Sequence, residues 1–186
     1  MQRLTKQELR KEVLDLIKHQ KEEDALRKSR IISDKFLALP VFKKAKNVLF
    51  YASCKGEVDT FFLINRALSL GKCVALPKVL KDTKQIMAVS IRSTDELKPG
   101  AYGIPEPEDR GSNLLGAAEL DLVVVPGLAF DFSCRRIGRG QGYYDRFLSE
   151  LPLATPCVGL AYDFQMVKEI PACEEHDRSV TQVLHN

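Results

Sequence analysis

Residues 120–131, LDLVVVPGLAFD, decide the fold class of this 186-residue chain. Their first half contains a continuous apolar run, which is typical of a strand buried on both faces inside a parallel sheet. The run stops at Pro126 and Gly127, residues that end a strand and begin a loop. The stretch therefore predicts an interior parallel strand followed by a loop at the carboxyl edge of the sheet.

Helical and extended segments alternate on both sides of this strand. Thr5 and Glu8 form a capping-box pattern ahead of a first helix, and a second helix is expected from about residue 23 to residue 39. Further strands are expected at 47–53, 73–79, 86–92, 156–162 and 177–184, and further helices at 58–71 and 142–151. This alternation predicts an α/β fold, in which helices cover both faces of a mostly parallel sheet.

The composition is that of an ordinary globular protein. The hydrophobic fraction is 45%, the charged fraction is 28% and the formal net charge is only +3, which favours neither disorder nor a nucleic-acid partner. No apolar run reaches the ~18 residues of a membrane span, and the charged start, MQRLTKQELRKE, lacks the apolar core of a signal peptide. We expect one domain over residues 1–186, a monomer in the cytoplasm without nucleic-acid or membrane partners.

The cysteines give no sign of a metal or redox site. They are odd in number, scattered and without a CxxC pair: Cys54, Cys73, Cys134, Cys157 and Cys173. We therefore expect reduced thiols that mostly pack in the core as small apolar groups.

Residues 135–148, RRIGRGQGYYDRFL, are the strongest candidate for a functional site. Gly138, Gly140 and Gly142 permit backbone conformations in which successive N–H groups turn inward around an anion. A helix is expected directly after them, and its N-terminus offers further N–H groups. Because the helix dipole contributes only about 0.3–1 kcal/mol at an exposed site, Arg135, Arg136 and Arg139 must supply much of the attraction for phosphate.

The segment matches none of the common phosphate motifs. It lacks GxxxxGK followed by Ser or Thr, and a GxGxxG pattern would need glycine at the position of Tyr143. Asp145, in the first turn of the expected helix, is placed to meet a magnesium ion on the phosphates. An acidic residue there also stabilises the helix dipole without any ligand, so the residues alone leave both interpretations open.

The same residues resemble the 5-formyltetrahydrofolate cyclo-ligase family, also called methenyltetrahydrofolate synthetase. The run GRGQGYYDR is the most specific motif, and KQELR, YASCKGEVDT, YGIPEP, VPGLAFD and EEHDRSV stand in the family's order. The resemblance covers essentially the whole chain. It implies a single three-layer, Rossmann-like α/β domain. The implied reaction is the ATP-dependent closure of 5-formyltetrahydrofolate, with or without a polyglutamate tail, to 5,10-methenyltetrahydrofolate, with Mg²⁺ as cofactor and release of ADP and phosphate.

The resemblance also assigns residues to ligands. It implies nucleotide contacts at Lys6, Arg10, Arg136, Ile137, Gly138, Arg139, Gly140, Gln141, Gly142, Tyr143 and Tyr144. It implies folate contacts at Ala52, Glu57, Arg139 and Tyr143, and magnesium contacts at Asp145 and Asp177. The i, i+4 spacing of Lys6 and Arg10 places both on one helix face, within reach of one phosphate group. Without the resemblance, that face would be interpreted as merely solvated.

Two positions depart from the family pattern. Cys134 stands where the family commonly has glycine, and Thr181 stands where an aspartate usually follows EHD. The second departure weakens a metal-binding role for the tail but leaves Asp177 in place. His176, beside Asp177, is interpreted as a structural residue or as one that supports a neighbouring ligand of the site.

A second hypothesis is a non-catalytic RNA- or nucleotide-binding domain that uses the glycine-rich segment and the basic first helix. Against it, aromatic and basic residues are not interleaved along several strands as a stacking surface requires. A third hypothesis is an ATP-dependent enzyme that acts on another folate or on a carboxylate.

Overall fold

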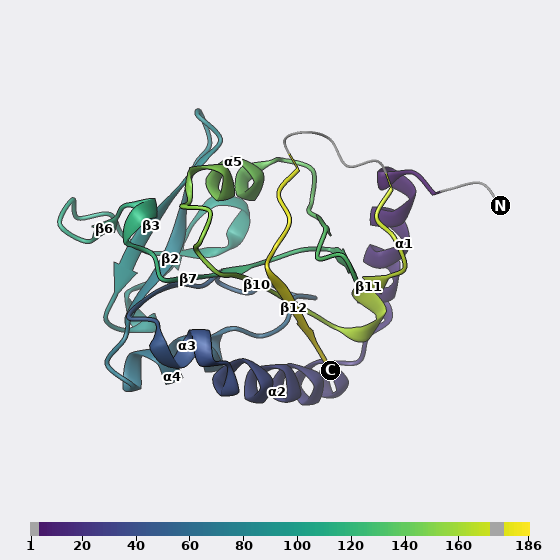
Figure 1. The fold of residues 1–186 in the computed structure, drawn as a ribbon, viewed down its shortest axis with the longest axis horizontal. Coiled ribbons are helices and arrows are strands. Elements are labelled where there is room, and N and C mark those ends of the chain that lie inside the picture. Colours follow the sequence, from purple (N-terminus) through teal and green to yellow (C-terminus); the bar gives the residue numbers. More distant parts are fainter. Residues whose placement is uncertain (1–3, 172–176) are drawn as a thin grey trace.

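The interior strand predicted from LDLVVVP is β7 (Leu122–Val125), and all four of its residues are buried. The structure, a computed structural model, describes residues 4–171 and 177–186. Within those residues β7 is the third strand of a seven-stranded sheet with the order β12-β10-β7-β1-β2-β3-β6 (Figure 1).

The sheet is mostly parallel, as predicted. Its other strands are β1 (Asn47–Leu49), β2 (Cys73–Leu80), β3 (Gln85–Ile91), β6 (Leu114–Leu115), β10 (Cys157–Ala161) and β12 (Gln182–His185). The neighbours from β12 to β2 are all parallel, whereas β3 is antiparallel to β2 and β6 is antiparallel to β3. The β2–β3 pair is a hairpin, and these are the two successive strands that the sequence pattern predicted without a helix between them.

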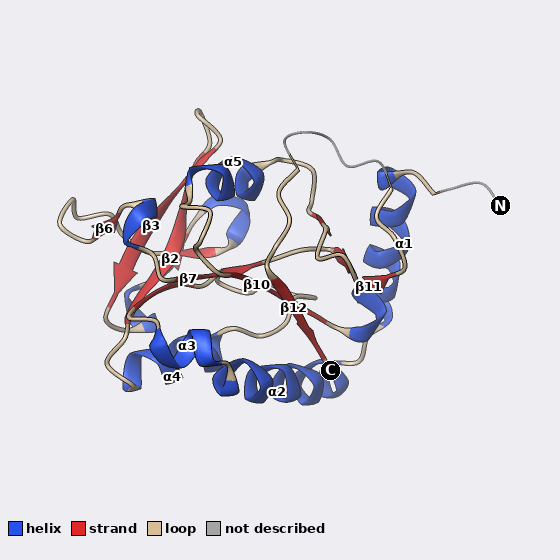
Figure 2. Ribbon diagram, viewed as in Figure 1, coloured by secondary structure: helices blue, strands red, loops and turns tan. Residues whose placement is uncertain are grey.

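Helices cover both faces of this sheet (Figure 2). On one face lies α5 (Tyr143–Glu150), and on the other lie α2 (Glu22–Ala38), α3 (Pro40–Lys44) and α4 (Phe61–Ser69). The alternating side chains of β7 divide between the two layers, because Leu122 and Val124 join the cluster of α2, α3 and α4 while Val123 and Val125 join that of α5. The predicted α/β class is thus confirmed.

The first helix, α1 (Lys6–His19), lies at one end of the molecule (Figure 1). It begins at the predicted capping box of Thr5 and Glu8. Leu9 and Val13 pack against Ile137. That residue belongs to a small second sheet of β11 (Met166–Val167), β8 (Ala129–Asp131) and β9 (Arg136–Ile137). This small sheet was not predicted, and it connects α1 to the segment that carries the glycines.

The Pro/Gly-rich region between β3 and β7 contains short elements only. β4 (Lys98–Pro99) pairs with β5 (Pro105–Glu106), and single 3₁₀ turns occur at Thr94–Glu96, Ala101–Gly103 and Ala117–Glu119. A fourth 3₁₀ turn, Asp163–Gln165, follows β10. Among the described residues, no helix combines the length and the apolar character that crossing a membrane requires.

The described cysteines are free thiols. Only Cys157 is buried, and Cys54, Cys73 and Cys134 are partly exposed. The expectation that most of them pack in the core is therefore wrong. Cys173 lies outside the described residues.

Candidate functional site

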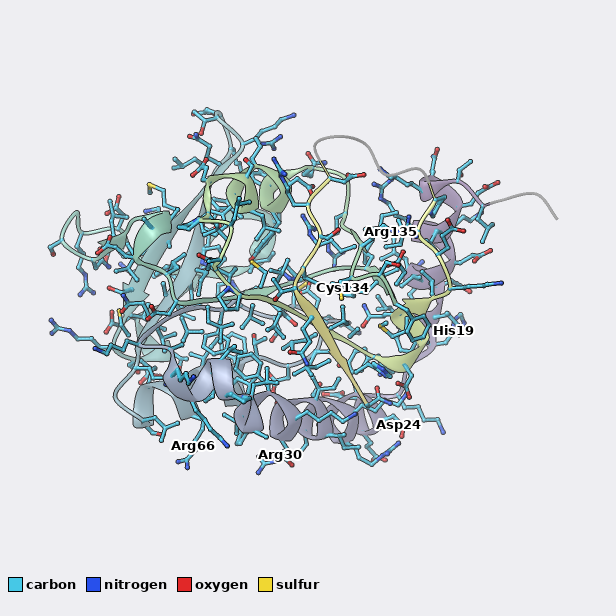
Figure 3. The ribbon with its side chains drawn as sticks, in the orientation of Figure 1. His19, Asp24, Arg30, Arg66, Cys134 and Arg135 are labelled. Carbon is cyan, nitrogen blue, oxygen red and sulfur yellow. The ribbon has the colours of Figure 1, made fainter. Side chains whose placement is uncertain are left out.

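The loops that follow β1, β7 and β10 meet at one edge of the sheet, because these strands are parallel. The segment after β7 forms β8, which pairs with β9 directly before the glycine loop (residues 138–142). The PGLAFD segment and the glycine-rich segment thus lie at the same edge of the sheet. Figure 3 shows Cys134 and Arg135 in this region, between the sheet and α1, while Arg30 and Arg66 lie on the opposite side of the molecule.

The glycine loop has the left-handed backbone that its composition predicts. The φ angle is +94° at Gly140 and +69° at Gly142, which is the N-cap of α5. Arg146, one turn into that helix, donates hydrogen bonds to the carbonyl of Gln141 at 2.7 Å and to that of Lys84 at 2.8 Å. The loop is therefore fixed at its carboxyl side by the helix that it begins.

Two cations of α1 reach the same edge. Arg10 Nε donates to the carbonyl of Gly138 at 2.9 Å, and a Cβ added at Gly140 would lie 3.7 Å from the Arg10 guanidinium carbon. Lys6 Nζ lies 2.6 Å from Asp177 Oδ2. The i, i+4 pair predicted to share one helix face thus lies against the glycine loop and the start of the C-terminal segment.

A buried cation lies behind the loop. The Arg136 side chain is 3% exposed, and its Nη2 donates to Asp145 Oδ1 at 2.7 Å. The same oxygen accepts the backbone N–H of Arg178 at 3.2 Å. Burial lowers the pKa of the Arg136 guanidinium, and the negative charges of Asp145 and Asp177 are among the influences that oppose this shift. The two predicted magnesium ligands therefore belong to one charged cluster around Arg136.

Asp145 and Asp177 fit a magnesium site that phosphate oxygens complete. In residues 4–171 and 177–186, no group of three or more His, Cys, Asp or Glu side chains is arranged to hold a metal ion. Mg²⁺ is commonly bound by one or two carboxylates together with substrate phosphates and water. Two carboxylates beside a candidate phosphate loop meet that requirement, and the assignment of magnesium stays a prediction.

Glu57 ends the β1 turn (residues 54–57) and faces the glycine loop. Its Oε2 accepts the N–H of Cys54 at 3.1 Å, and its Oε1 lies 3.5 Å from Arg139 Nη2. The Glu57 side chain is 15% exposed and that of Arg139 is 50% exposed. The residue predicted to contact folate and a residue predicted to contact the nucleotide are thus neighbours.

Tyrosine side chains surround this turn. Tyr51 donates to the carbonyl of Val58, and Tyr162 donates to the carbonyl of Glu57, both at 3.0 Å. The hydroxyl of Tyr144 is buried and has no hydrogen-bond partner among the described residues. Burial raises the pKa of Tyr144, and the negative charge of Glu57 raises it further. Tyr51 begins the YASCKGEVDT motif but was assigned no role from the sequence, and Tyr162 lies in none of the quoted motifs.

Tyr143 connects the start of α5 to the YGIPEP segment. Its hydroxyl lies 3.1 Å from that of Tyr102, and the two rings meet edge to face with centroids 6.3 Å apart. Tyr102 is 63% exposed. The pairing joins residues that are 41 positions apart, so no local pattern could have predicted it.

The other predicted residues lie at this edge in different roles. Ile137 and Ala52 are each 3% exposed, so their side chains belong to the core. Gln141 is exposed. Arg135 pairs with the buried Asp131 at 2.6 Å, so this arginine stabilises the turn before the loop, and its contact with phosphate stays a prediction.

The two departures from the family pattern have distinct structural positions. Cys134 has φ = +61°, a left-handed conformation that favours glycine. Thr181 Oγ1 accepts the N–H of Cys157 at 3.0 Å and donates to the carbonyl of the same residue at 2.8 Å. Thr181 thus binds the amino end of β10, at the other end of that strand from the candidate site. His176 lies outside the described residues.

These features define an α/β protein with a cationic, glycine-lined candidate site for an anion at the carboxyl edge of its sheet. The sequence profile of the 5-formyltetrahydrofolate cyclo-ligase family matches residues 2–186. The chain is 29% identical to the 5-formyltetrahydrofolate cyclo-ligase of Mus musculus, over 97% of this chain and 93% of that protein. It is 35% identical to the Haemophilus influenzae enzyme of the same name, over 69% of this chain and 70% of that protein.

A solved structure agrees with the sequence matches. The NMR structure of Aquifex aeolicus 5,10-methenyltetrahydrofolate synthetase superposes with a TM-score of 0.86 and 36% identity, over 98% of this chain and 90% of that one. The chain belongs to the 5-formyltetrahydrofolate cyclo-ligase family.

Proposed function

We propose that this protein catalyses the ATP-dependent closure of 5-formyltetrahydrofolate to 5,10-methenyltetrahydrofolate, with ADP and phosphate as the other products. The observation that carries the proposal is the 3.5 Å contact between Arg139 and Glu57. It joins a phosphate-type loop to the carboxylate of the β1 turn, so that a nucleotide and a second ligand can meet. Membership of the cyclo-ligase family supports the identity of that second ligand.

The chemistry needs an activated formyl group, because the nitrogen lone pair of a formamide is delocalised into its carbonyl. The γ-phosphate of ATP is transferred to the formyl oxygen, and ADP leaves. The neighbouring amine nitrogen of the folate then attacks the formyl carbon and loses its proton, and phosphate departs with the former formyl oxygen. Since nucleophile and electrophile belong to one molecule, holding the folate in the correct conformation supplies much of the rate.

The side chains of this chain would act by position and charge, as is usual in phosphoryl transfer. Arg10 and Lys6 from α1, with Arg136 and Arg139 from the loop region, would bind the triphosphate through charge-assisted hydrogen bonds. The N–H groups of the glycine loop and of the first turn of α5 would add uncharged donors. Each of these cations already has an acceptor in this structure, so phosphate oxygens would replace carboxylate or carbonyl oxygens.

Asp145 and Asp177 would hold Mg²⁺, which supplies charge neutralisation on the phosphates when bound. Glu57 would accept hydrogen bonds from N–H groups of the folate ring, since an ionised carboxylate can only accept. The hydrogen bond from Cys54 N–H keeps its second oxygen in place. Ala52 and Tyr143 would border the same ring.

We further propose that the protein works as a cytoplasmic monomer on folates with or without a polyglutamate tail. The small net charge of +3 supports the absence of nucleic-acid and membrane partners. Size-exclusion chromatography with light scattering tests the monomer, and a dimer at micromolar concentration would contradict it.

The decisive experiment mixes the purified protein with 5-formyltetrahydrofolate, ATP and magnesium and follows the absorbance of the methenyl product. Asp145→Asn should lower kcat by about 100-fold while the melting temperature stays near that of the wild type. Asp82→Asn, which removes the same charge from the exposed β2–β3 turn, is the matched control and should be fully active. Absence of ATP-dependent product with the wild-type protein would reject the proposal, and tight retention of single-stranded RNA on a filter would favour the binding-domain alternative.

A further inference from the structure

Three tyrosine hydroxyl groups lie around the β1 turn, and two of them have a defined structural use. Tyr51 donates to the carbonyl of Val58, and Tyr162 donates to the carbonyl of Glu57. Tyr162 Oη also lies 3.0 Å from Ser29 Oγ, from α2. These bonds fix two consecutive carbonyl groups and therefore orient the backbone from which the Glu57 carboxylate projects.

The third hydroxyl, that of Tyr144, is buried without a hydrogen-bond partner in the described parts of the chain. Folding removes such a hydroxyl from water without supplying a replacement hydrogen bond, which costs free energy. A native protein therefore rarely keeps an unpaired buried hydroxyl without a reason. Phenylalanine would fill the same volume without this cost. Sites where a local rule is broken in this way are commonly functional.

Packing prevents the Tyr144 side chain from turning to solvent. Its ring contacts both hydrophobic clusters of the core, and the guanidinium carbon of Arg136 lies 5.9 Å from the ring centroid. One of these clusters includes Tyr51 and Val58, which lie on either side of the β1 turn. The hydroxyl is thus held between the buried cation behind the glycine loop and the carboxylate of the β1 turn.

We propose that Tyr144 binds the folate rather than the nucleotide, by donating its hydroxyl hydrogen to an acceptor atom of the formylated ring system beside Glu57. The inference rests on the proposed function and goes beyond it, because the family resemblance assigns Tyr144 to the nucleotide. A carboxylate can only accept hydrogen bonds, whereas the folate ring system carries both N–H groups and carbonyl oxygens. A neutral phenol beside Glu57 supplies the donor that such a ligand requires.

Access to the hydroxyl would come from the side of the Arg139–Glu57 ion pair. Tyr144 as a whole is partly exposed, and Arg139 is half-exposed on the solvent side of Glu57. A folate that takes the place of Arg139 on Glu57 comes next to the Tyr144 ring. The hydroxyl would then gain the partner that it lacks.

Tyr144→Phe removes only the hydroxyl and tests the assignment. We expect the KM for 5-formyltetrahydrofolate to rise about tenfold while the KM for ATP stays within about twofold. The melting temperature should stay the same or rise by about 2–4 °C, because an unpaired buried group is lost. The matched control is Tyr162→Phe, which removes a paired hydroxyl and should lower the melting temperature.

A titration of the protein with 5-formyltetrahydrofolate alone separates this inference from the proposed function. A weaker folate Kd in Tyr144→Phe supports the assignment even if wild-type turnover is absent, an outcome that would overturn only the proposed reaction. An unchanged folate Kd would overturn the assignment, whatever the melting temperature. An equal rise of the ATP and folate KM values would also overturn the assignment, because it would show that Tyr144 only holds the loop in place.

Discussion

Arg139 Nη2 lies 3.5 Å from Glu57 Oε1, so a cation proposed for phosphate is paired with the carboxylate proposed for folate. Neither side chain can serve its ligand fully while the pair is intact. A ligand that engages one partner releases the other, and this linkage is reciprocal. The two substrates should therefore bind with positive cooperativity.

We expect a non-hydrolysable ATP analogue to tighten the binding of 5-formyltetrahydrofolate about fivefold in the wild-type protein. In Arg139→Ala the ratio of the two folate Kd values should approach one, because Glu57 is then released without nucleotide. Calorimetric titration measures both values. Lys55→Ala removes the same charge from an exposed position of the β1 turn and should keep the wild-type ratio. A fivefold effect that survives in Arg139→Ala would show that the ion pair does not couple the sites.

Cys134→Gly should stabilise the protein by about 0.5–1 kcal/mol. The left-handed φ of +61° at Cys134 costs a residue with a Cβ roughly 1–2 kcal/mol, and glycine avoids that strain but loses part of the gain through its freer unfolded chain. Urea unfolding measures the difference. Cys134→Ala keeps a Cβ and should give no gain, and equal stabilisation by both substitutions would contradict the strain argument.

Gly56→Ala should destabilise the protein by more than about 2 kcal/mol. The φ of Gly56 is +93°, and an added Cβ would lie 2.2 Å from Ile17 Cγ2 on α1. The substitution therefore adds a clash to the backbone strain. Gly71→Ala is the matched control, since Gly71 has φ = +74° with nothing within 4 Å and should lose only about 1 kcal/mol. Equal losses of unfolding free energy in both variants would show that α1 can move away from the added Cβ without destabilising the protein.

Alkaline pH should weaken the fold through its thiols. Burial raises the pKa of Cys54 and of Cys157, each from 9.0 to about 11. Between these values the unfolded chain loses thiol protons that the folded chain keeps, so the free energy of unfolding falls as the pH rises from 9 to 11. Urea unfolding across this range should show a shallower decline in Cys54→Ala. The same slope in wild type and variant would exclude a contribution from Cys54.

Local patterns predicted the parts of the fold that local forces determine. The capping box of Thr5 and Glu8, the apolar run of β7 and the glycine-opened helix α5 are each set by neighbouring residues. The small sheet of β8, β9 and β11 escaped prediction because strands of two or three residues carry no readable period. Strand β1 ends at Leu49 rather than near residue 53, because its pairing with β2 and with β7 stops at Leu49.

The candidate site was predicted as a set of residues rather than as a set of contacts. The resemblance named Glu57 and Arg139, but their ion pair joins distant segments, and no spacing rule indicates it. Because Cys134 stands where the family commonly has glycine, the sequence already indicated an unusual backbone at this position. The unpaired hydroxyl of Tyr144 became visible only when the packing around it was known.

The ion pair between Lys6 and Asp177 links side chains that are 171 positions apart in the sequence. A growing polypeptide on the ribosome would carry Lys6 long before its counter-charge is synthesised, and closing so large a loop is among the later events of folding. Helical signal in a refolding experiment should accordingly return before turnover does. Enzymatic activity then reports complete folding, since an incomplete or partly folded chain has not yet brought Asp177 to Lys6.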